Sequence, residues 1–167
     1  VAIDNLSFAR PGGSAPTPNP TPTPTPTPSP TPTGGSGGSA YGTIEAEAAS
    51  TSKGATIGSS AVTDLGNGDW LKYAKVDFGA AAPAKQFVAK VASGAGGGVS
   101  GLVEVRLDSA TSPVIGSFAV GNTGGWTSWR TIPANIGGTS GVHDVYITFT
   151  SGQPADFVAI DSLTFGR

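Results

Sequence analysis

The sequence predicts an all-β protein in which two antiparallel sheets pack against each other as a β-sandwich. From Tyr41 onward, short runs of alternating apolar and polar residues are separated by Gly, Ser, Asn and Pro, a pattern typical of half-buried strands. No stretch combines a 3.6-residue apolar period with capping residues, so little helix is expected. Eight or nine short strands in about 128 residues fit two packed antiparallel sheets.

The expected strands are separated by recognisable turn segments. Asn67-Gly68 precedes the second run, the glycine-rich stretch 94–101 separates the third from the fourth, and residues 122–125 precede the sixth. In chain order the expected strands are 42–47, 70–78, 85–93, 102–108, 113–120, 127–132, 141–150 and 157–165. Alternate positions within them supply the predicted core, which includes Phe87, Val91, Val103, Val105, Leu107, Tyr146 and Phe149.

A proline-rich tract precedes the predicted sandwich. Thr and Pro alternate almost without interruption from Pro16 to Thr33, and a Gly/Ser stretch, 34–39, follows. Proline favours extended polyproline II, so residues 11–39 are predicted to be a disordered, semi-rigid linker with a flexible joint. Such spacers are typical of secreted modular hydrolases, whereas a proline-rich ligand for a signalling domain is the weaker interpretation. The sequence therefore predicts a secreted, extracellular protein.

The two ends of the chain resemble each other. Residues 1–10 read VAIDNLSFAR and residues 158–167 read VAIDSLTFGR, identical at seven of ten positions. We therefore expect at least two copies of one module in a longer protein. Residues 1–10 are then the last strand of an upstream sister module, and residues 40–167 are the second copy.

The composition argues against several classes of function. The chain has no cysteine, which excludes disulfides, cysteine-bound zinc and a thiol nucleophile. Its net charge of −2, with 12% charged residues, provides no basic surface for nucleic acid or an anionic membrane. There is one histidine, no Gly-x-Ser-x-Gly motif and no phosphate-binding loop, since the stretch 94–101 lacks a Gly-Lys-Ser/Thr ending.

Acidic pairs provide the remaining enzyme hypothesis. Asp64 with Asp69, or Asp156 with Asp161, could mimic the two carboxylates of a glycoside hydrolase. Each of these residues has a simpler role in a turn, a loop or a metal site. We therefore expect no catalysis within this chain.

Five motifs, in order, resemble carbohydrate-binding module family 6, to which family 35 is closely related. They are IEAE at 44–47, NGDWLKY at 67–73, GGWTSW at 124–129, GVHDVYITF at 141–149 and FVAID at 157–161. The resemblance spans residues 41–167. It implies a jelly-roll sandwich that binds a polysaccharide without catalysis of its own, as a monomer attached to a glycoside hydrolase in the same polypeptide.

A calcium site is expected near the first strand. Glu45 and Glu47 are two residues apart, so on a strand both carboxylates would point to the same face and repel each other without a cation. Ca²⁺ accepts six to eight oxygen ligands. The resemblance implies Asp161 as a third ligand, which would tie the first strand to the last. The alternative is a solvent-facing strand edge with an isolated aspartate.

Trp126 is the candidate platform for a sugar ring. It follows a glycine-rich turn, and the resemblance places it in a cleft at the rim of the sandwich. Two positions depart from the family pattern: Asp64 stands where many members have a second aromatic residue, and Ala159 stands where many have an asparagine. Asp64, Gln153 and Asp156 are therefore candidate polar ligand-binding residues.

Other features of the resemblance leave alternatives open. It implies that Trp70 and Tyr73 belong to the core and that the concave face of one sheet offers a second cleft. His143 is expected to be structural. Members of the family bind xylan, cellulose ends, β-1,3-glucans or agarose. The overall residue pattern of this chain is most similar to that of modules attached to bacterial β-1,3-glucanases. A structural spacer or adhesion module that has lost sugar binding is the alternative function.

Overall fold

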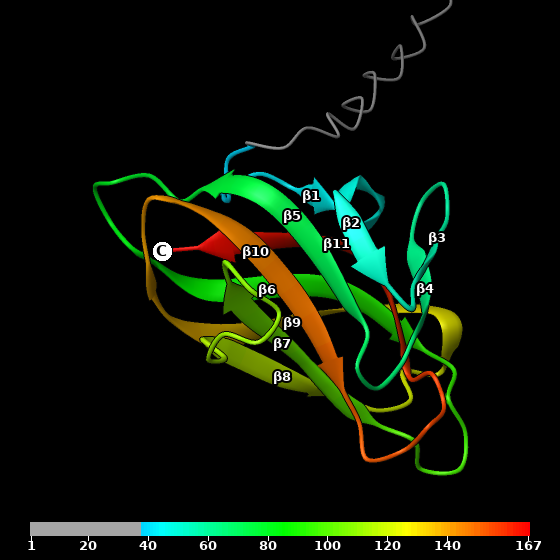
Figure 1. The fold of residues 1–167 in the computed structure, drawn as a ribbon. Coiled ribbons are helices and arrows are strands. Elements are labelled where there is room, and N and C mark those ends of the chain that lie inside the picture. Colours follow the sequence, from blue (N-terminus) through cyan, green and yellow to red (C-terminus); the bar gives the residue numbers. More distant parts are fainter. Residues whose placement is uncertain (1–37) are drawn as a thin grey trace, which may run out of the picture. The chain divides into compact units, whose positions relative to one another are not determined.

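The computed structural model describes residues 38–167. The predicted sister-module strand, 1–10, and all but the last two residues of the predicted linker, 11–39, lie outside the described residues. The described part is an all-β sandwich of two antiparallel sheets, which confirms the predicted fold class (Figure 1). It contains eleven strands and one three-residue 3-10 turn, η1 (Ala46–Ala48). No helix in this part of the chain is long and apolar enough to cross a membrane.

One sheet has five strands in the order β2-β5-β10-β7-β8. β10 lies at its centre, with Tyr146 opposite Lys72 of β5 on one side and Arg106 of β7 on the other. The sheet lies in front of the other one in Figure 1. Its strands are β2 (Thr51–Lys53), β5 (Trp70–Asp77), β10 (Val142–Thr150), β7 (Gly101–Leu107) and β8 (Gly116–Val120).

The other sheet has six strands, five of them in the order β3-β4-β11-β6-β9, while β1 pairs with β11 outside this path. The register places Ala159 of β11 opposite Ala92 of β6, and Ser93 of β6 opposite Gly125 of β9. Its strands are β1 (Ile44–Glu45), β3 (Thr56–Ile57), β4 (Val62–Leu65), β11 (Val158–Gly166), β6 (Ala84–Ser93) and β9 (Gly125–Thr139).

The core between the sheets is built around phenylalanines. Phe87 packs against Phe165 with ring centroids 5.4 Å apart, and Phe149 packs edge-on against Phe157 at 6.4 Å. Burying each such side chain contributes about 1.5–3 kcal/mol. Five predicted core residues, Phe87, Val91, Val103, Val105 and Phe149, are fully buried or nearly so, which confirms them, while Leu107 is partly buried against the core.

The core assignment was wrong for Tyr146 and for Trp70. Both side chains are half-buried and lie on the outer face of the five-stranded sheet, because successive strand residues point to opposite faces. Their neighbours Val145 and Leu71 fill the core instead. Tyr73, two residues after Leu71, is buried as expected.

The expected strand list was incomplete at the edges of the sheets. β2, β3 and β4 were not predicted, because they are two to four residues long and mostly polar, so their pairing rather than their apolar pattern defines them. The strand expected at 127–132 extends over the fifteen residues of β9. The strand expected at 113–120 begins only at Gly116.

The antiparallel topology brings four loops to one end of the sandwich. Residues 66–69, 94–100, 121–124 and 151–157 connect strands whose paired ends are adjacent in the two sheets. This end is called the rim below. At the opposite end, the ring of His143 contacts Asp108 through Nδ1 (3.0 Å to Oδ2) and the carbonyl oxygen of Ser140 through Nε2 (3.1 Å).

Candidate functional site

Hydrogen bonds between loops hold the rim together. The backbone N–H of Ser151 donates to Oδ1 of Asn67 (3.0 Å), and the Ser151 hydroxyl donates to the carbonyl oxygen of Ser100 (2.8 Å). The backbone N–H of Ser100 in turn donates to Oε1 of Gln153 (3.1 Å). Three of the four rim loops are thus joined, so the rim is a defined surface on which side chains keep fixed positions.

Trp126 is the large exposed aromatic residue of the rim. It is the second residue of β9, and 45% of its surface is exposed. A methyl group added at Gly94 would lie only 2.5 Å from Cδ1 of Trp126. The indole therefore rests directly on the Gly94 backbone, and the glycine allows this close approach because it has no side chain. One face of the ring is supported, and the side chain is still substantially open to solvent.

The turn before Trp126 is fixed to the end of β6. The backbone N–H of Thr123 donates to the Ser93 carbonyl oxygen (2.9 Å), and the Ser93 N–H donates to Oγ1 of Thr123 (2.8 Å). The Asn122 amide donates to the carbonyl oxygen of Ala95 (2.8 Å). Gly124 has φ 109°, a conformation that favours glycine. These contacts orient the chain that carries Trp126.

A bulge in β9 accounts for the position of both Trp126 and Trp129. Between the pairs Val91–Arg130 and Ser93–Gly125, β9 advances five residues (130 − 125) while β6 advances two (93 − 91). The three extra residues arch away from the ladder, as bulges at sheet margins commonly do to redirect side chains. Alternation alone does not predict where these two side chains point.

Two strands, β11 and β6, separate Asp64 in β4 from Trp126 in β9. It is exposed, has φ 57° and accepts a hydrogen bond from Oγ1 of Thr63 (3.1 Å). Asp64 falls in a register shift between β4 and β11, opposite the segment that contains Ala159. Ala159 and its partner Ala92 are 1% and 0% exposed but lie outside the core cluster. Between Asp64 and Trp126, Ala159 of β11 and Ala92 of β6 are thus small, buried side chains outside the core cluster.

The other two predicted polar residues lie in the β10–β11 loop of the same rim. Oε1 of Gln153 accepts the hydrogen bond from Ser100, so this side chain also stabilises the loop. Asp156 is exposed and lies against Gly66, where an added methyl group would be 2.7 Å from Oδ1 of Asp156. The four predicted ligand-binding residues therefore share one end of the sandwich, and their role in binding stays a prediction.

The three predicted calcium ligands lie near one another, but the strand argument for two of them was wrong. Glu45 is in β1, whereas Glu47 lies in η1, because β1 ends after its two pairs with β11 and Ala46 then turns into the core. Burial raises the pKa of Glu45, and so do the nearby carboxylates of Glu47 and Asp161, against the opposing effect of Lys90.

The donor set of this acidic region fits a hard cation in part. Oε2 of Glu47 is buried and has no hydrogen-bond partner, an arrangement that costs free energy unless a cation or proton satisfies it. Asp161 accepts a hydrogen bond from the Ser162 hydroxyl (2.8 Å) and pairs with Nζ of Lys90 (3.2 Å). Within residues 38–167, no three acidic or histidine side chains converge closely enough to form a ready metal site.

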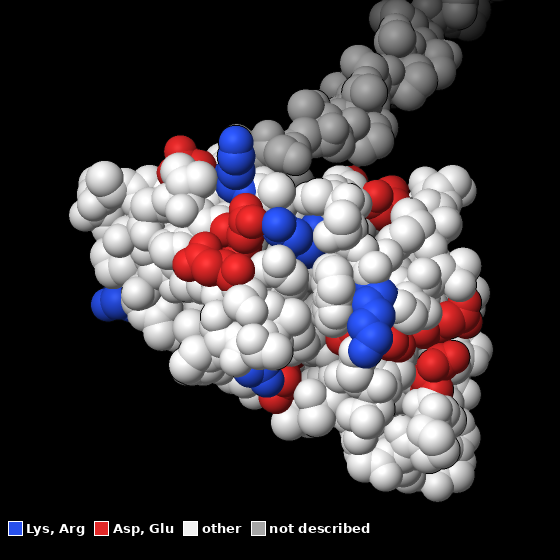
Figure 2. Space-filling view, viewed as in Figure 1, with Lys and Arg blue, Asp and Glu red and all other residues white. Residues whose placement is uncertain are grey.

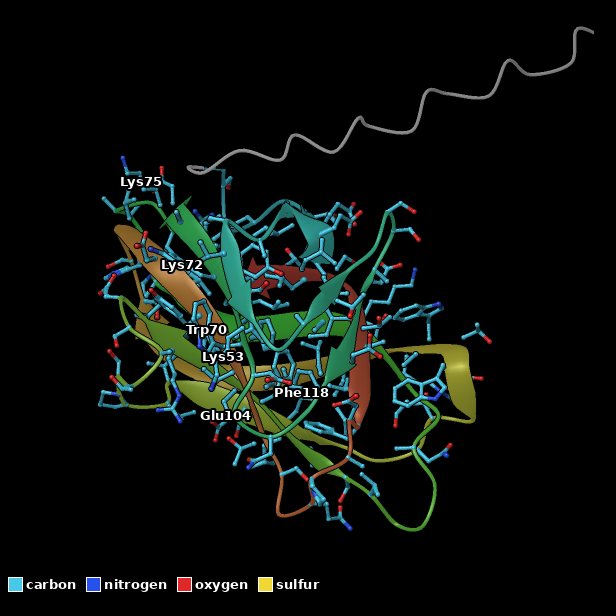
Figure 3. The ribbon with its side chains drawn as sticks, turned by 45° about the vertical axis from the view of Figure 1, so that its right-hand side comes forward. Lys53, Trp70, Lys72, Lys75, Glu104 and Phe118 are labelled. Atoms are coloured by element: carbon cyan, nitrogen blue, oxygen red, sulfur yellow. The ribbon has the colours of Figure 1, made fainter. Side chains whose placement is uncertain are left out.

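The outer face of the five-stranded sheet carries paired side chains that the sequence analysis missed. The rings of Trp70 and Tyr146 are 5.6 Å apart. Lys72 pairs with Asp144 at 2.7 Å, and Arg106 pairs with Glu104. Figure 3 shows Lys53, Trp70, Lys72 and Glu104 along this side, with Phe118 between the sheets. Hydrogen bonding to Lys72, and to the Lys75 N–H, lowers the pKa of Asp144.

The charges on this face are balanced. Figure 2, which shows the molecule with β5 and β10 toward the reader, has Lys and Arg interspersed with Asp and Glu among mostly uncharged residues. The alternation of Trp70 and Lys72 with Leu71 and Tyr73 is the signal that could have identified this face from the sequence.

Comparisons with known proteins agree with this geometry. The sequence model for carbohydrate-binding module family 6 matches residues 37–167. An arabinoxylan arabinofuranohydrolase from Paenibacillus polymyxa is 41% identical over 112 residues, which are 67% of this chain and 17% of that protein. The chain thus spans about a fifth of the length of the curated relatives it matches, 17% and 22% for the first two.

Two solved structures show the same fold. A family 6 module from Clostridium cellulolyticum, in complex with xylose, is 35% identical with a TM-score of 0.68, and covers 77% of this chain and 99% of its own. A β-1,3-glucan-binding family 6 module from Bacillus halodurans is 30% identical with a TM-score of 0.69, and covers 78% and 99%. The sandwich and its rim define a carbohydrate-binding module, a class of domain that is typically non-catalytic. The chain belongs to carbohydrate-binding module family 6.

Proposed function

We propose that the module binds a polysaccharide at the rim, with Trp126 as the stacking platform, and thereby brings an attached glycoside hydrolase to its substrate. The observation that carries this proposal is the supported and exposed indole of Trp126, 45% exposed on the glycine backbone beneath it. Aromatic rings bind the apolar C–H faces of pyranose rings through dispersion and the negative potential of the ring face. The hydrogen-bonded turn before Trp126 holds the ring in place before the ligand arrives, which lowers the entropic cost of binding.

Polar groups near the platform would form hydrogen bonds with the hydroxyl groups of the sugar. Asp64 and Asp156 are exposed at the same end of the sandwich, and Gln153 is partly exposed there. The buried Ala159 provides no amide on the sheet between Asp64 and Trp126. A site with one platform and few polar contacts should bind a single sugar segment weakly. Affinity for a polymer would then come from many contacts in parallel.

Xylan or arabinoxylan is the ligand we place first. Relatives at 41% and 39% identity are arabinoxylan arabinofuranohydrolases, and one similar module was solved with xylose. A β-1,3-glucan is the second choice, because one similar module binds it. Both polymers are neutral and rich in hydroxyl groups, as suits a rim whose platform is an uncharged ring.

The test is calorimetry on soluble oligosaccharides beside depletion binding on insoluble xylan, curdlan and cellulose. Trp126→Ala should weaken binding by roughly tenfold to a hundredfold, because stacking on one ring is worth about 1–3 kcal/mol. Asp64→Ala should show whether the acidic residue contributes a polar contact. The thermal unfolding curve of each variant confirms that the fold is retained.

Two results would contradict this proposal. Unchanged affinity in folded Trp126→Ala would move the site to the outer face of the five-stranded sheet, where Tyr146→Ala would then be the deciding variant. A wild-type module that binds none of these glycans would favour a structural spacer or adhesion role instead.

We further propose that Glu45, Glu47 and Asp161 hold a structural Ca²⁺. The buried, unpaired Oε2 of Glu47 and the proximity of the other two carboxylates support this assignment. Calcium would supply positive charge that ties β1 and η1 to β11. An ion that binds only the folded state raises its stability by mass action, so excess chelator should lower the melting temperature and Ca²⁺ should restore it. Identical melting curves with chelator and with Ca²⁺ would exclude the site.

The organisation of the parent protein is also a proposal. The repeated ending at 1–10 and 158–167, together with the Thr-Pro tract, supports a secreted protein in which a sister module and a glycoside hydrolase share one polypeptide. The module itself is proposed to be a monomer. Joining the sister module should raise retention on an insoluble polymer well above that of either module alone, because the second contact becomes intramolecular. Equal retention of the two-module and one-module proteins would contradict this organisation.

A further inference from the structure

A shallow depression lies on the outer face of the six-stranded sheet, away from the core. Seven residues line it: Thr43, Val88, Lys90, Thr131, Ser162, Leu163 and Thr164. Four of these seven residues carry hydroxyl groups. The depression is not part of the rim loops described above.

The strand register places these groups side by side. Ser162 of β11 pairs with Lys90 of β6, and Lys90 pairs with Thr131 of β9, so the three residues form one row across the sheet. In the next row toward the opposite end, Thr164 pairs with Val88. An apolar floor at Val88 is therefore flanked by hydroxyl groups from neighbouring strands. A hydroxyl group can both donate and accept hydrogen bonds, as sugar hydroxyls do.

The charge of the depression is already compensated. Nζ of Lys90 lies 3.2 Å from Oδ2 of Asp161, and it also lies 5.8 Å from the centre of the Trp129 ring. The ammonium group thus has an anionic partner and an aromatic neighbour within the protein. This arrangement favours a neutral ligand that carries many hydroxyl groups over a phosphate or a carboxylate.

The depression and the rim lie at different points along the same strand, β6. From Lys90 to Gly94 the chain advances four residues, about 13 Å at the usual rise of a strand. Trp126 rests on Gly94, and Trp129, in the same bulge of β9, lies beside Lys90. A chain of sugars held at Trp126 and running along β6 would therefore pass Trp129 before it reaches Thr131.

We propose that this depression is an accessory subsite for a neutral glycan chain whose other end is held at Trp126. The inference rests on the proposed sugar binding at the rim and adds a direction and a minimum length to it. A short oligosaccharide would occupy the rim alone. A longer one would also contact Val88 and the threonine hydroxyls.

The experiment is calorimetry with xylo-oligosaccharides from two to six residues. Wild type should bind the hexaose about tenfold more tightly than the biose. The double variant Thr131→Val with Thr164→Val removes two hydroxyls but keeps the β-branched shape that suits a strand. The double variant should lose most of the gain in affinity from the biose to the hexaose, while it binds the biose as wild type does. Thr56→Val, on the exposed strand β3, is the matched control and should keep the gain.

Backbone amide NMR shifts provide a second measurement. The hexaose should perturb the signals of Lys90 and Thr131, and the biose should not. The inference is overturned if the double variant keeps the full gain with length, if wild type shows no gain, or if the biose perturbs the same amides. If wild type binds no xylo-oligosaccharide at all, or if Trp126→Ala binds as wild type does, the proposed rim site itself fails, and the accessory subsite fails with it.

Discussion

Trp126 and Trp70 are the same type of side chain in two different surroundings. Trp126 lies in a bulge at the rim, supported by the Gly94 backbone and 45% exposed. Trp70 lies in a regular ladder on the outer face of the five-stranded sheet, half-buried and 5.6 Å from the ring of Tyr146. Both are on the outside of the sandwich, but only Trp126 combines a solvent-exposed ring with direct packing on a glycine backbone.

The difference shows what makes an aromatic residue a platform in this fold. Trp70 belongs to a surface on which aromatic rings contact one another and Lys72 pairs with Asp144. Trp126 rests instead on a residue without a side chain. We therefore expect Trp70 to contribute mainly to stability and Trp126 mainly to ligand affinity.

Replacing Trp70 should have the largest effect on stability. Trp70→Ala should lower the free energy of unfolding by about 2 kcal/mol, because it exposes part of the sheet and removes the aromatic contact with Tyr146. Trp126→Ala should change it by about 0.5 kcal/mol or less. Urea denaturation followed by circular dichroism measures both. A larger loss for Trp126 than for Trp70, or a loss of sugar affinity in folded Trp70→Ala, would break the comparison.

The sequence allowed the sandwich to be predicted because alternation identifies each long strand without reference to its partners. Alternation within 85–93 and 102–108 places Phe87 and Val105 in the core correctly. It cannot detect strands as short as β2 and β3, which exist because neighbouring strands offer hydrogen-bond partners. Tyr146 and Phe149 are three residues apart, so a regular strand cannot turn both toward the core, and the prediction for Tyr146 broke the alternation that places Phe149 correctly.

Less of the candidate site could be predicted. The glycine-rich turn before Trp126 indicated an exposed ring, and the structure shows this exposure. The packing of the ring on Gly94 could not be predicted, since Gly94 is 32 residues away in sequence (126 − 94) and lies in a different loop. Glu47 was assigned to a strand, yet the 3-10 turn forms because Ala46 is drawn into the core. Both features depend on contacts between distant segments.

Gly94 allows the platform to be disturbed without changing Trp126. In Gly94→Ala the new methyl group would lie 2.5–2.8 Å from three atoms of the indole, so the ring must move off its seat. We expect a loss of about threefold to tenfold in sugar affinity by calorimetry, smaller than that of Trp126→Ala. Gly96→Ala is the matched control, because nothing lies within 4 Å of its added methyl group. Equal affinities of the two alanine variants would show that the backbone seat does not position the ring.

The smallest expected effect concerns the charge pair beside Tyr146. The hydrogen bond to Lys72, with a further one from the Lys75 N–H, lowers the pKa of Asp144. The folded state therefore binds fewer protons than the unfolded state, whose aspartates have a pKa of about 3.9. The resulting stabilisation is fully present above about pH 5 and is lost as the pH falls through the lowered pKa. The pair lies on the solvent-facing side of the sheet, with both side chains partly exposed, which keeps its contribution small.

Asp144→Asn removes the charge and retains an oxygen that can accept the hydrogen bond from Lys75. Its melting temperature should lie slightly below that of wild type at pH 7, and the two should converge as the pH falls below about 4. Asp77→Asn is the matched control, since Asp77 accepts a comparable backbone hydrogen bond from Gly79 (2.7 Å) but forms no salt bridge among residues 38–167. A difference for Asp144→Asn that stays constant from pH 7 to pH 3 would show that shape rather than charge matters there. The difference between the outer face of the five-stranded sheet, where side chains contact one another, and the exposed rim would then rest on the aromatic contacts alone.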